Sequence, residues 1–144
     1  MNIRIMACME VYRNAYANIQ PTDSNVVEKT LATNYYGTLE ATQSFLSIIR
    51  DDGRLVNVAS MSGHLHKFSP EIQQHFLNSK TLDDVHNLAE DFKAAVAEGK
   101  EKEKGFVSAA YATSKALEIA MTRVIASEWK QKGSKVLINA CCPG

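Results

Sequence analysis

Tyr111 and Lys115 are the residues whose types and spacing best suit chemistry in this chain, within the run Tyr-Ala-Thr-Ser-Lys. The run lies near the start of a helix expected from about residue 109 to 132, where residues four apart share one face. An ammonium beside a phenol favours the phenolate and makes the phenol a better proton donor near neutral pH. Because tyrosine and lysine also occur four apart by chance in many helices, this pair alone is weak evidence.

Two polar residues earlier in the chain, Ser60 and Asn34, lie at positions in expected elements that suggest a functional role. Ser60 ends a short run, 54–60, that is rich in branched apolar residues and suits a buried parallel strand. Ligands of open α/β sheets bind at the carboxyl ends of the strands, where Ser60 would lie. Asn34 and Gly37 fall inside a helix expected from Asp23 or Ser24 to Arg50, although both types are unfavourable there, glycine by about 1 kcal/mol. A functional role for Asn34 and a solvated side chain fit this pattern equally well.

Taken together, four motifs in this order resemble the short-chain dehydrogenase/reductase family. They are Asn34-x-x-Gly37, Ser60-x-x-Gly63, Tyr111-x-x-x-Lys115 and Pro143-Gly144. The tail 137–144 and the 51 positions between the serine and the tyrosine resemble the carbonyl reductases, which carry a helical insertion at that point. The resemblance covers roughly residues 23–144.

The resemblance implies an NADPH-dependent reductase of aldehydes, ketones or quinones. Tyr111 would give its proton to the substrate carbonyl oxygen as hydride arrives from the nicotinamide. Lys115 would make the tyrosine more acidic and hydrogen-bond the nicotinamide ribose. Ser60 would hold the carbonyl oxygen, and Asn34 would position a water that links Lys115 to solvent.

The same resemblance implies binding residues for the cofactor and for the substrate. The cofactor would contact Tyr111, Lys115, Pro143 and Gly144. The substrate would contact Ser60, Met61 and Cys142, although Met61 and Cys142 could equally serve as packing residues.

The order of expected elements predicts an α/β fold, as a partial Rossmann-like doubly wound parallel sheet with a helical insertion. Residues 1–144 would be a single, incomplete NAD(P)-binding catalytic domain, and residues 64–107 the insertion. Within the insertion, helices begin at Ser69-Pro70 and at Thr81, and the second ends at Gly99. Its buried face would carry Val85, Leu88, Phe92 and Val96. Further strands are expected at 135–140 and, weakly, near residues 3–8.

The chain departs from the family pattern in one large respect. No two of its seven glycines have the spacing of the family's phosphate-binding turn. The residues that choose between NADP and NAD are also absent, so NAD is not excluded. We therefore expect this chain to bind a dinucleotide poorly on its own, and an inactive truncated fragment or interaction module is the alternative function.

Composition narrows the classes of partner. Sixteen basic residues balance sixteen acidic ones, which gives no reason to expect nucleic acid or an anionic membrane as partner. No apolar run is long enough for a membrane span, no leader pattern is visible, and the three cysteines form no disulfide framework. His64 and His66 lack the spacing of a metal site. We expect a cytoplasmic enzyme without a metal. Because the insertion would cover the helices through which many relatives associate, the intact enzyme should be monomeric.

Overall fold

Two parallel strands form the sheet in the computed structural model, which describes residues 22–143. β1 (Arg54–Val58) pairs with β2 (Leu137–Cys141), with Arg54 opposite Leu137 and Val58 opposite Cys141. Both strands were expected, although β2 starts two residues later because pairing begins where the Leu137 amide donates to the Gly53 carbonyl oxygen. The strand expected near residues 3–8, and Gly144, lie outside the described range.

The first long helix is interrupted and shorter than the sequence predicts. It consists of α2 (Ser24–Leu31), a π-helical segment η2 (Ala32–Gly37) and α3 (Thr38–Leu46). Asp23 caps it by accepting from the Val26 amide at 2.9 Å. The expected end at Arg50 is wrong, since the helix stops at Leu46. Beyond that point Ile48 is 76% exposed, so continuing the helix through this position would bury no apolar side chain there, and Ile49 packs against the core from outside the helix.

Two 3-10 turns and two helices connect β1 to the last helix. The turns are η3 (Met61–Gly63) and η4 (Leu65–Lys67), and the helices are α4 (Pro70–Asn78) and α5 (Leu82–Ala97). Ser69 caps α4, and a reciprocal capping box of Thr81 and Asp84 starts α5. All four residues expected on the buried face of α5 are buried. That residues 64–107 are an insertion relative to the family that the sequence resembles stays a prediction.

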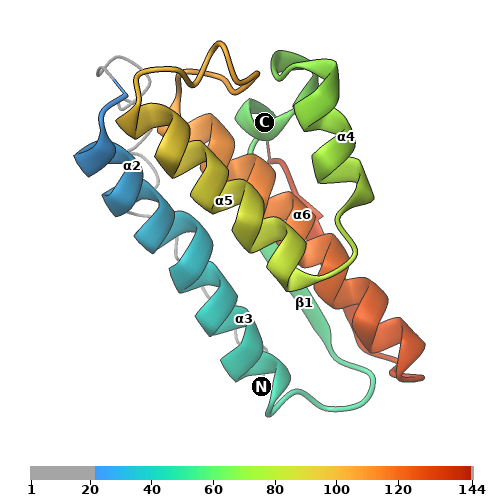
Figure 1. Cartoon of the computed structure of the whole chain (residues 1–144). Coiled ribbons are helices and arrows are strands. Elements are labelled where there is room, and N and C mark those ends of the chain that lie inside the picture. The colour runs from blue at the N-terminus through green and yellow to red at the C-terminus, as the bar shows by residue number, and fades with distance from the viewer. Residues whose placement is uncertain (1–21, 144) are drawn as a thin grey trace.

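The last helix, α6 (Ala110–Gln131), occupies the centre of the molecule and ends before Gly133, whose φ is +74°. The strands lie behind the helices, and α5 lies in front, where it contacts both α2 and α6 (Figure 1). Leu117 and Met121 of α6 pack in the same core as Leu31 of α2 and Phe92 of α5. Because the first part of α6 meets neighbours on nearly every side, even its polar residues there are buried, namely Thr113, Ser114, Lys115, Glu118 and Thr122.

The other face of the sheet has no helix over it among the described residues. Val56, Val58 and Leu137 are each about half exposed, and the strand register places all three on this face. The observed elements therefore make up one half of a doubly wound fold. In the described range, no helix combines the length and the apolar character that crossing a membrane needs.

Candidate active site

Lys115 is fixed between α6 and the end of β1. Its side chain is 5% exposed, and its ammonium donates to the Val58 carbonyl oxygen at 2.9 Å. Val58 is the last residue of β1, two positions before Ser60. The ammonium therefore lies at the carboxyl end of the strand, the edge where the sequence predicts a binding site.

Tyr111 lies one helical turn before Lys115, near the start of α6. The Lys115 ammonium is 5.9 Å from the centre of the Tyr111 ring, so the two side chains occupy the same face of the helix. The start of α6 therefore also lies at this edge of the sheet. A phenol and an ammonium in this arrangement can move a proton to or from a bound molecule.

Ser60 and Gly63 form the turn that brings the end of β1 against α6. The Ser60 hydroxyl caps η3 by accepting from the Ser62 amide at 3.1 Å, and as a hydroxyl it can still donate its own proton. A Cβ added to Gly63 would lie 2.7 Å from the backbone carbon of Lys115. Only glycine allows so close an approach, which is the physical reason for the Ser-x-x-Gly spacing.

Asn34 reaches α6 through Ser114. Its amide donates to the Ser114 hydroxyl at 3.1 Å, and that hydroxyl donates to the Tyr111 carbonyl oxygen at 2.8 Å. Asn34 lies in the π-helical segment η2, a distortion that occurs frequently at functional sites. Asn34 is therefore buried and bonded, so the solvated alternative is wrong. The water-positioning role stays a prediction.

The remaining predicted residues lie at the same edge but differ in accessibility. Cys142 follows β2 and is partly exposed, and Met61 in η3 is 54% exposed. Pro143 follows Cys142 and lies at the end of the described range, whereas Gly144 lies outside it. Exposure at this edge is compatible with contact to a ligand.

Glu118 was missed by the sequence analysis. It lies three residues after Lys115, is 2% exposed, and its carboxylate accepts from the Lys115 ammonium at 2.7 Å. Burial raises the pKa of Glu118, and the charge and hydrogen bond of Lys115 oppose that rise. The only signal in the sequence is the i, i+3 spacing of lysine and glutamate, which is common on solvated helices.

A buried chain of hydrogen bonds holds α6 in register with β1. Asn57 accepts from Thr42 at 3.2 Å and donates to Thr122 at 2.9 Å. Thr122 in turn donates to the Glu118 carbonyl oxygen at 2.8 Å. The chain links α3, β1 and α6, and it fixes the backbone of the turn that carries Glu118.

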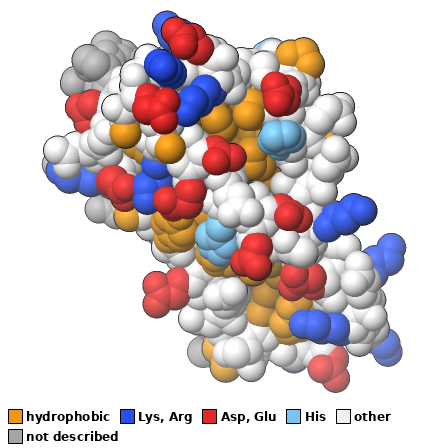
Figure 2. Space-filling model, in the orientation of Figure 1, with side chains coloured by type: hydrophobic (Ala, Val, Ile, Leu, Met, Phe, Trp, Pro, Cys, Tyr) orange, Lys and Arg blue, Asp and Glu red, His pale blue; other side chains and the backbone are white. Residues whose placement is uncertain are grey.

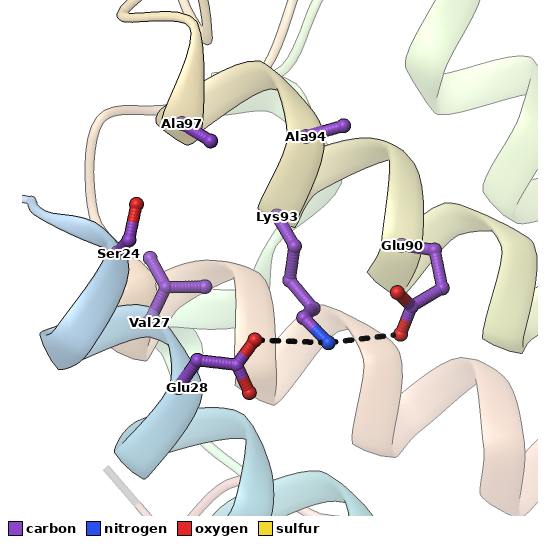
Figure 3. A pocket seen from close by; sticks show the side chains of 7 residues that line it. All are labelled: Ser24, Val27, Glu28, Glu90, Lys93, Ala94 and Ala97. Carbon is purple, nitrogen blue, oxygen red and sulfur yellow. Dashed lines mark hydrogen bonds and ion pairs between the residues drawn. The ribbon is translucent and has the colours of Figure 1, made fainter.

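A second group of charges lies away from these residues, in a groove of about 310 Å³ between α2 and α5. Figure 3 shows Lys93 pointing between two carboxylates, with Glu28 at 3.0 Å and Glu90 at 3.2 Å. Tyr36 also donates to Glu90, and this bond lowers the pKa of Glu90. None of the predicted site residues lines the groove, and acidic and basic side chains are mixed over this face (Figure 2). The group joins two helices and offers no reactive pair.

Known proteins with similar sequences include carbonyl reductases. Carbonyl reductase (NADPH) 1 from Macaca fascicularis and from Homo sapiens are each 33% identical to the chain over 136 residues, which cover 90% of this chain. No family model matches the chain. Among solved structures, menthone neomenthol reductase from Mentha piperita is 26% identical, has a TM-score of 0.72 and covers 93% of this chain.

The chain belongs to the short-chain dehydrogenase/reductase family. It is of the carbonyl reductase type, as the sequence analysis predicted. Salutaridine reductase from Papaver somniferum, at 24% identity and a TM-score of 0.75 over 99% of this chain, confirms the Rossmann-type fold. The chain spans about half the length of the curated relatives it matches, 49% for the first two, and half of each solved structure.

Proposed function

We propose that the protein reduces a carbonyl group of a small molecule to an alcohol, with NADPH as hydride donor and Tyr111 as proton donor. The main support is the position of the Lys115 ammonium, which faces the Tyr111 ring and bonds to the strand that leads into Ser60. The names of the relatives, carbonyl reductases that use NADPH, agree with this chemistry.

The described residues fit one end of NADPH. A lysine ammonium has three donors, and Val58 and Glu118 take two of them, so one remains for a ribose hydroxyl. Tyr111 and Lys115 would hold the nicotinamide ribose, with Pro143 and Gly144 beside the ring. We find no site for the pyrophosphate of NADPH in this sequence, because no glycine pair in it has the spacing of a phosphate-binding turn. NADPH would therefore bind weakly to residues 1–144 alone.

When bound, the reduced nicotinamide supplies the hydride that forms the new C–H bond at the carbonyl carbon. The Ser60 hydroxyl donates to the carbonyl oxygen and stabilises the negative charge that develops there. Tyr111 transfers its phenolic proton to that oxygen, which completes the alcohol and leaves a phenolate. The Lys115 ammonium stabilises the phenolate until solvent returns the proton, along a route in which Asn34 would hold a water.

The placement of α5 supports a monomer for the intact enzyme. Helix α5 packs over both α2 and α6, the helices expected to join subunits in related enzymes (Figure 1). Its buried residues Leu88, Phe92 and Val96 occupy the surface that a partner subunit would need. Sedimentation of the protein from its natural gene should give one monomeric species, and a stable tetramer would contradict this.

Tyr111→Phe tests the proposed acid directly. We would measure carbonyl-dependent oxidation of NADPH, with a quinone and an aromatic aldehyde, by the protein from its natural gene. Tyr111→Phe should abolish turnover and leave the circular dichroism spectrum unchanged, whereas the control Tyr36→Phe should retain activity, because Tyr36 bonds to Glu90 in the α2–α5 groove. Unchanged turnover in Tyr111→Phe would exclude this mechanism.

A second candidate function is that of an interaction module that does not turn over substrate. The observation that favours it is the open sheet face with Val56, Val58 and Leu137 half exposed. Such an apolar face needs a cover, which another polypeptide could supply. Absence of NADPH oxidation by the natural protein, together with an intact fold, would favour this function.

A further inference from the structure

We propose that Glu118 is the positioning residue of Lys115, holding the ammonium beside Tyr111 and setting the pH at which the Tyr111–Lys115 pair releases its first proton. This inference rests on the proposed function, in which these two residues are the proton donor and its support. It assigns a role to a buried carboxylate that none of the four family motifs contains.

Glu118 is a charged residue that is buried. It lies on α6 beside the fully buried Leu117 and near Met121, and only 2% of its surface is exposed. Taking a carboxylate out of water costs several kcal/mol, roughly, unless a charge and hydrogen bonds compensate for it. The ammonium of Lys115, at 2.7 Å, is the partner that compensates here. An apolar side chain at this position would avoid the cost of burial altogether.

The pair restrains where the ammonium points. A lysine side chain has four flexible methylene groups, so a single hydrogen bond leaves its end mobile. In this chain the ammonium has two fixed acceptors, the Val58 carbonyl oxygen at 2.9 Å and the Glu118 carboxylate at 2.7 Å. One acceptor comes from β1 and the other from the next turn of α6. Together they leave the third donor for the site at the strand end.

The carboxylate also changes the charge that Tyr111 experiences. A negative charge beside an ammonium stabilises the protonated lysine, and it disfavours a phenolate nearby. Removal of Glu118 should therefore make the pair release its first proton at lower pH, whichever of the two residues loses it.

Among the described residues, Lys115 is the one charged side chain that acts on the Glu118 carboxyl. Of the elements packed against α6, β1 contributes a backbone carbonyl, the cap of η3 the Ser60 hydroxyl, and η2 the Asn34 amide and the phenol of Tyr35. On β2 the thiol of Cys141 is exposed, and the acidic and histidine side chains of α3 and α4 are exposed as well (Glu40, Glu71, His75). The charges of α2 and α5 lie at the surface, where Lys93 pairs with Glu28 and Glu90. The effect of Glu118 is thus separable from its surroundings.

The test is a titration of the whole chain with ¹³C at the tyrosine ζ and lysine ε carbons, followed by NMR. Tyr111→Phe and Lys115→Met assign the two signals. In Glu118→Gln, the first proton should leave the pair at a pH lower by about one unit. Glu118→Asp keeps the charge, so its titration should lie at least halfway back from that of Glu118→Gln to that of the wild type.

Glu128→Gln makes the same change ten residues further along α6, and the pH at which the pair loses its first proton should be the same as in the wild type. Superimposable titrations of the wild type and Glu118→Gln would overturn the proposal.

Two further measurements keep the test decisive. If Glu118→Gln does not fold, the coupling is read in reverse, since it is reciprocal. The Glu118 carboxyl carbon should then titrate at higher pH in Lys115→Met than in the wild type, and an unchanged titration would overturn the proposal. In the natural protein, the alkaline limb of kcat/KM for carbonyl reduction should move down with the NMR titration. If Glu118→Gln shifts the NMR titration but neither the wild type nor any variant reduces the carbonyl substrate, the proposed function is rejected and the role of Glu118 stands. If the protein reduces the substrate but the alkaline limb of kcat/KM does not move in Glu118→Gln, the role of Glu118 is rejected and the proposed function stands.

Discussion

The carbonyl oxygen of Val58 accepts a hydrogen bond of 2.9 Å from the Lys115 ammonium, across 57 positions of sequence. The same residue ends β1 and pairs with Cys141 of β2. A change in strand pairing would therefore move an acceptor of Lys115. The position of the lysine and the register of the sheet depend on each other.

Gly63→Ala should disturb the site through the backbone. The added methyl group would lie 2.7 Å from the Lys115 carbonyl carbon and 2.8 Å from the Ala116 nitrogen, and neither is a flexible side chain. We expect a loss of about 1–3 kcal/mol in the free energy of unfolding, measured with urea, and slower carbonyl reduction. Ser62→Ala is the control, because the backbone amide that bonds to Ser60 remains. Equal stability of the two variants would show that the turn can move away from α6.

Asn34→Asp should destabilise the fold although the two side chains have nearly the same shape. Asn34 donates to the Ser114 hydroxyl, and a carboxylate cannot donate. A buried charge without a donor should cost about 1–3 kcal/mol or more in the free energy of unfolding. Asn87→Asp, on the exposed side of α5, should change it by less than about 0.5 kcal/mol. A small effect in both variants would mean that Asn34 is not held as described.

Lys115→Met should change how stability depends on pH. Burial raises the pKa of Glu118, so the folded chain binds its proton more tightly than the unfolded chain does. The stabilisation that this carboxyl contributes is therefore fully present below its pKa in the unfolded chain, about 4.3. It is lost as the pH rises through its pKa in the folded chain. Lys115 opposes the rise in the pKa of Glu118, so in Lys115→Met the loss of stability should extend to higher pH. The free energy of unfolding, measured with urea between about pH 4 and pH 8, would show this.

Lys93→Met provides the comparison for this pH dependence. Lys93 pairs with Glu28 and Glu90, whose side chains are 60% and 58% exposed. Exposed pairs contribute little, about 0–1 kcal/mol, so the slope of stability against pH should stay close to that of the wild type. If both lysine variants showed the same slope, Glu118 would not be titrating in the buried state described.

Val56→Lys should reduce association of the chain. Val56 is 53% exposed on the sheet face that also carries Val58 and Leu137. An apolar face beside strand edges that no other described strand pairs with favours association without fixed stoichiometry. Sedimentation velocity over a range of concentrations should show a smaller fraction of associated chains in Val56→Lys than in the wild type. Ile48→Lys removes a residue that is more exposed, at 76%, but lies in the turn after α3, and association in this variant should persist. The opposite ranking would place the contact elsewhere.

The sequence predicted local structure best where the end of an element depends on neighbouring residues. Ser69 before Pro70, Thr81 at the start of α5, and Gly99 at positive φ after its end all mark helix ends, because a cap acts within one turn. The prediction failed at Arg50: α3 ends at Leu46, and the tertiary structure leaves Ile48 exposed, which the apolar pattern of the sequence does not show. The π-helical segment around Asn34 also escaped prediction, since periodicity does not distinguish it from an α-helix.

The sequence by itself determined the order of the four motifs, the family and the pairing of Tyr111 with Lys115 on one helical face. Only the tertiary structure decided that Lys115 bonds to the Val58 carbonyl oxygen and to a buried Glu118. Every residue has a backbone carbonyl, so composition cannot say which one a lysine will reach. Burial is likewise a property of the packed helices, and i, i+3 spacing describes a solvated pair and a buried pair equally well.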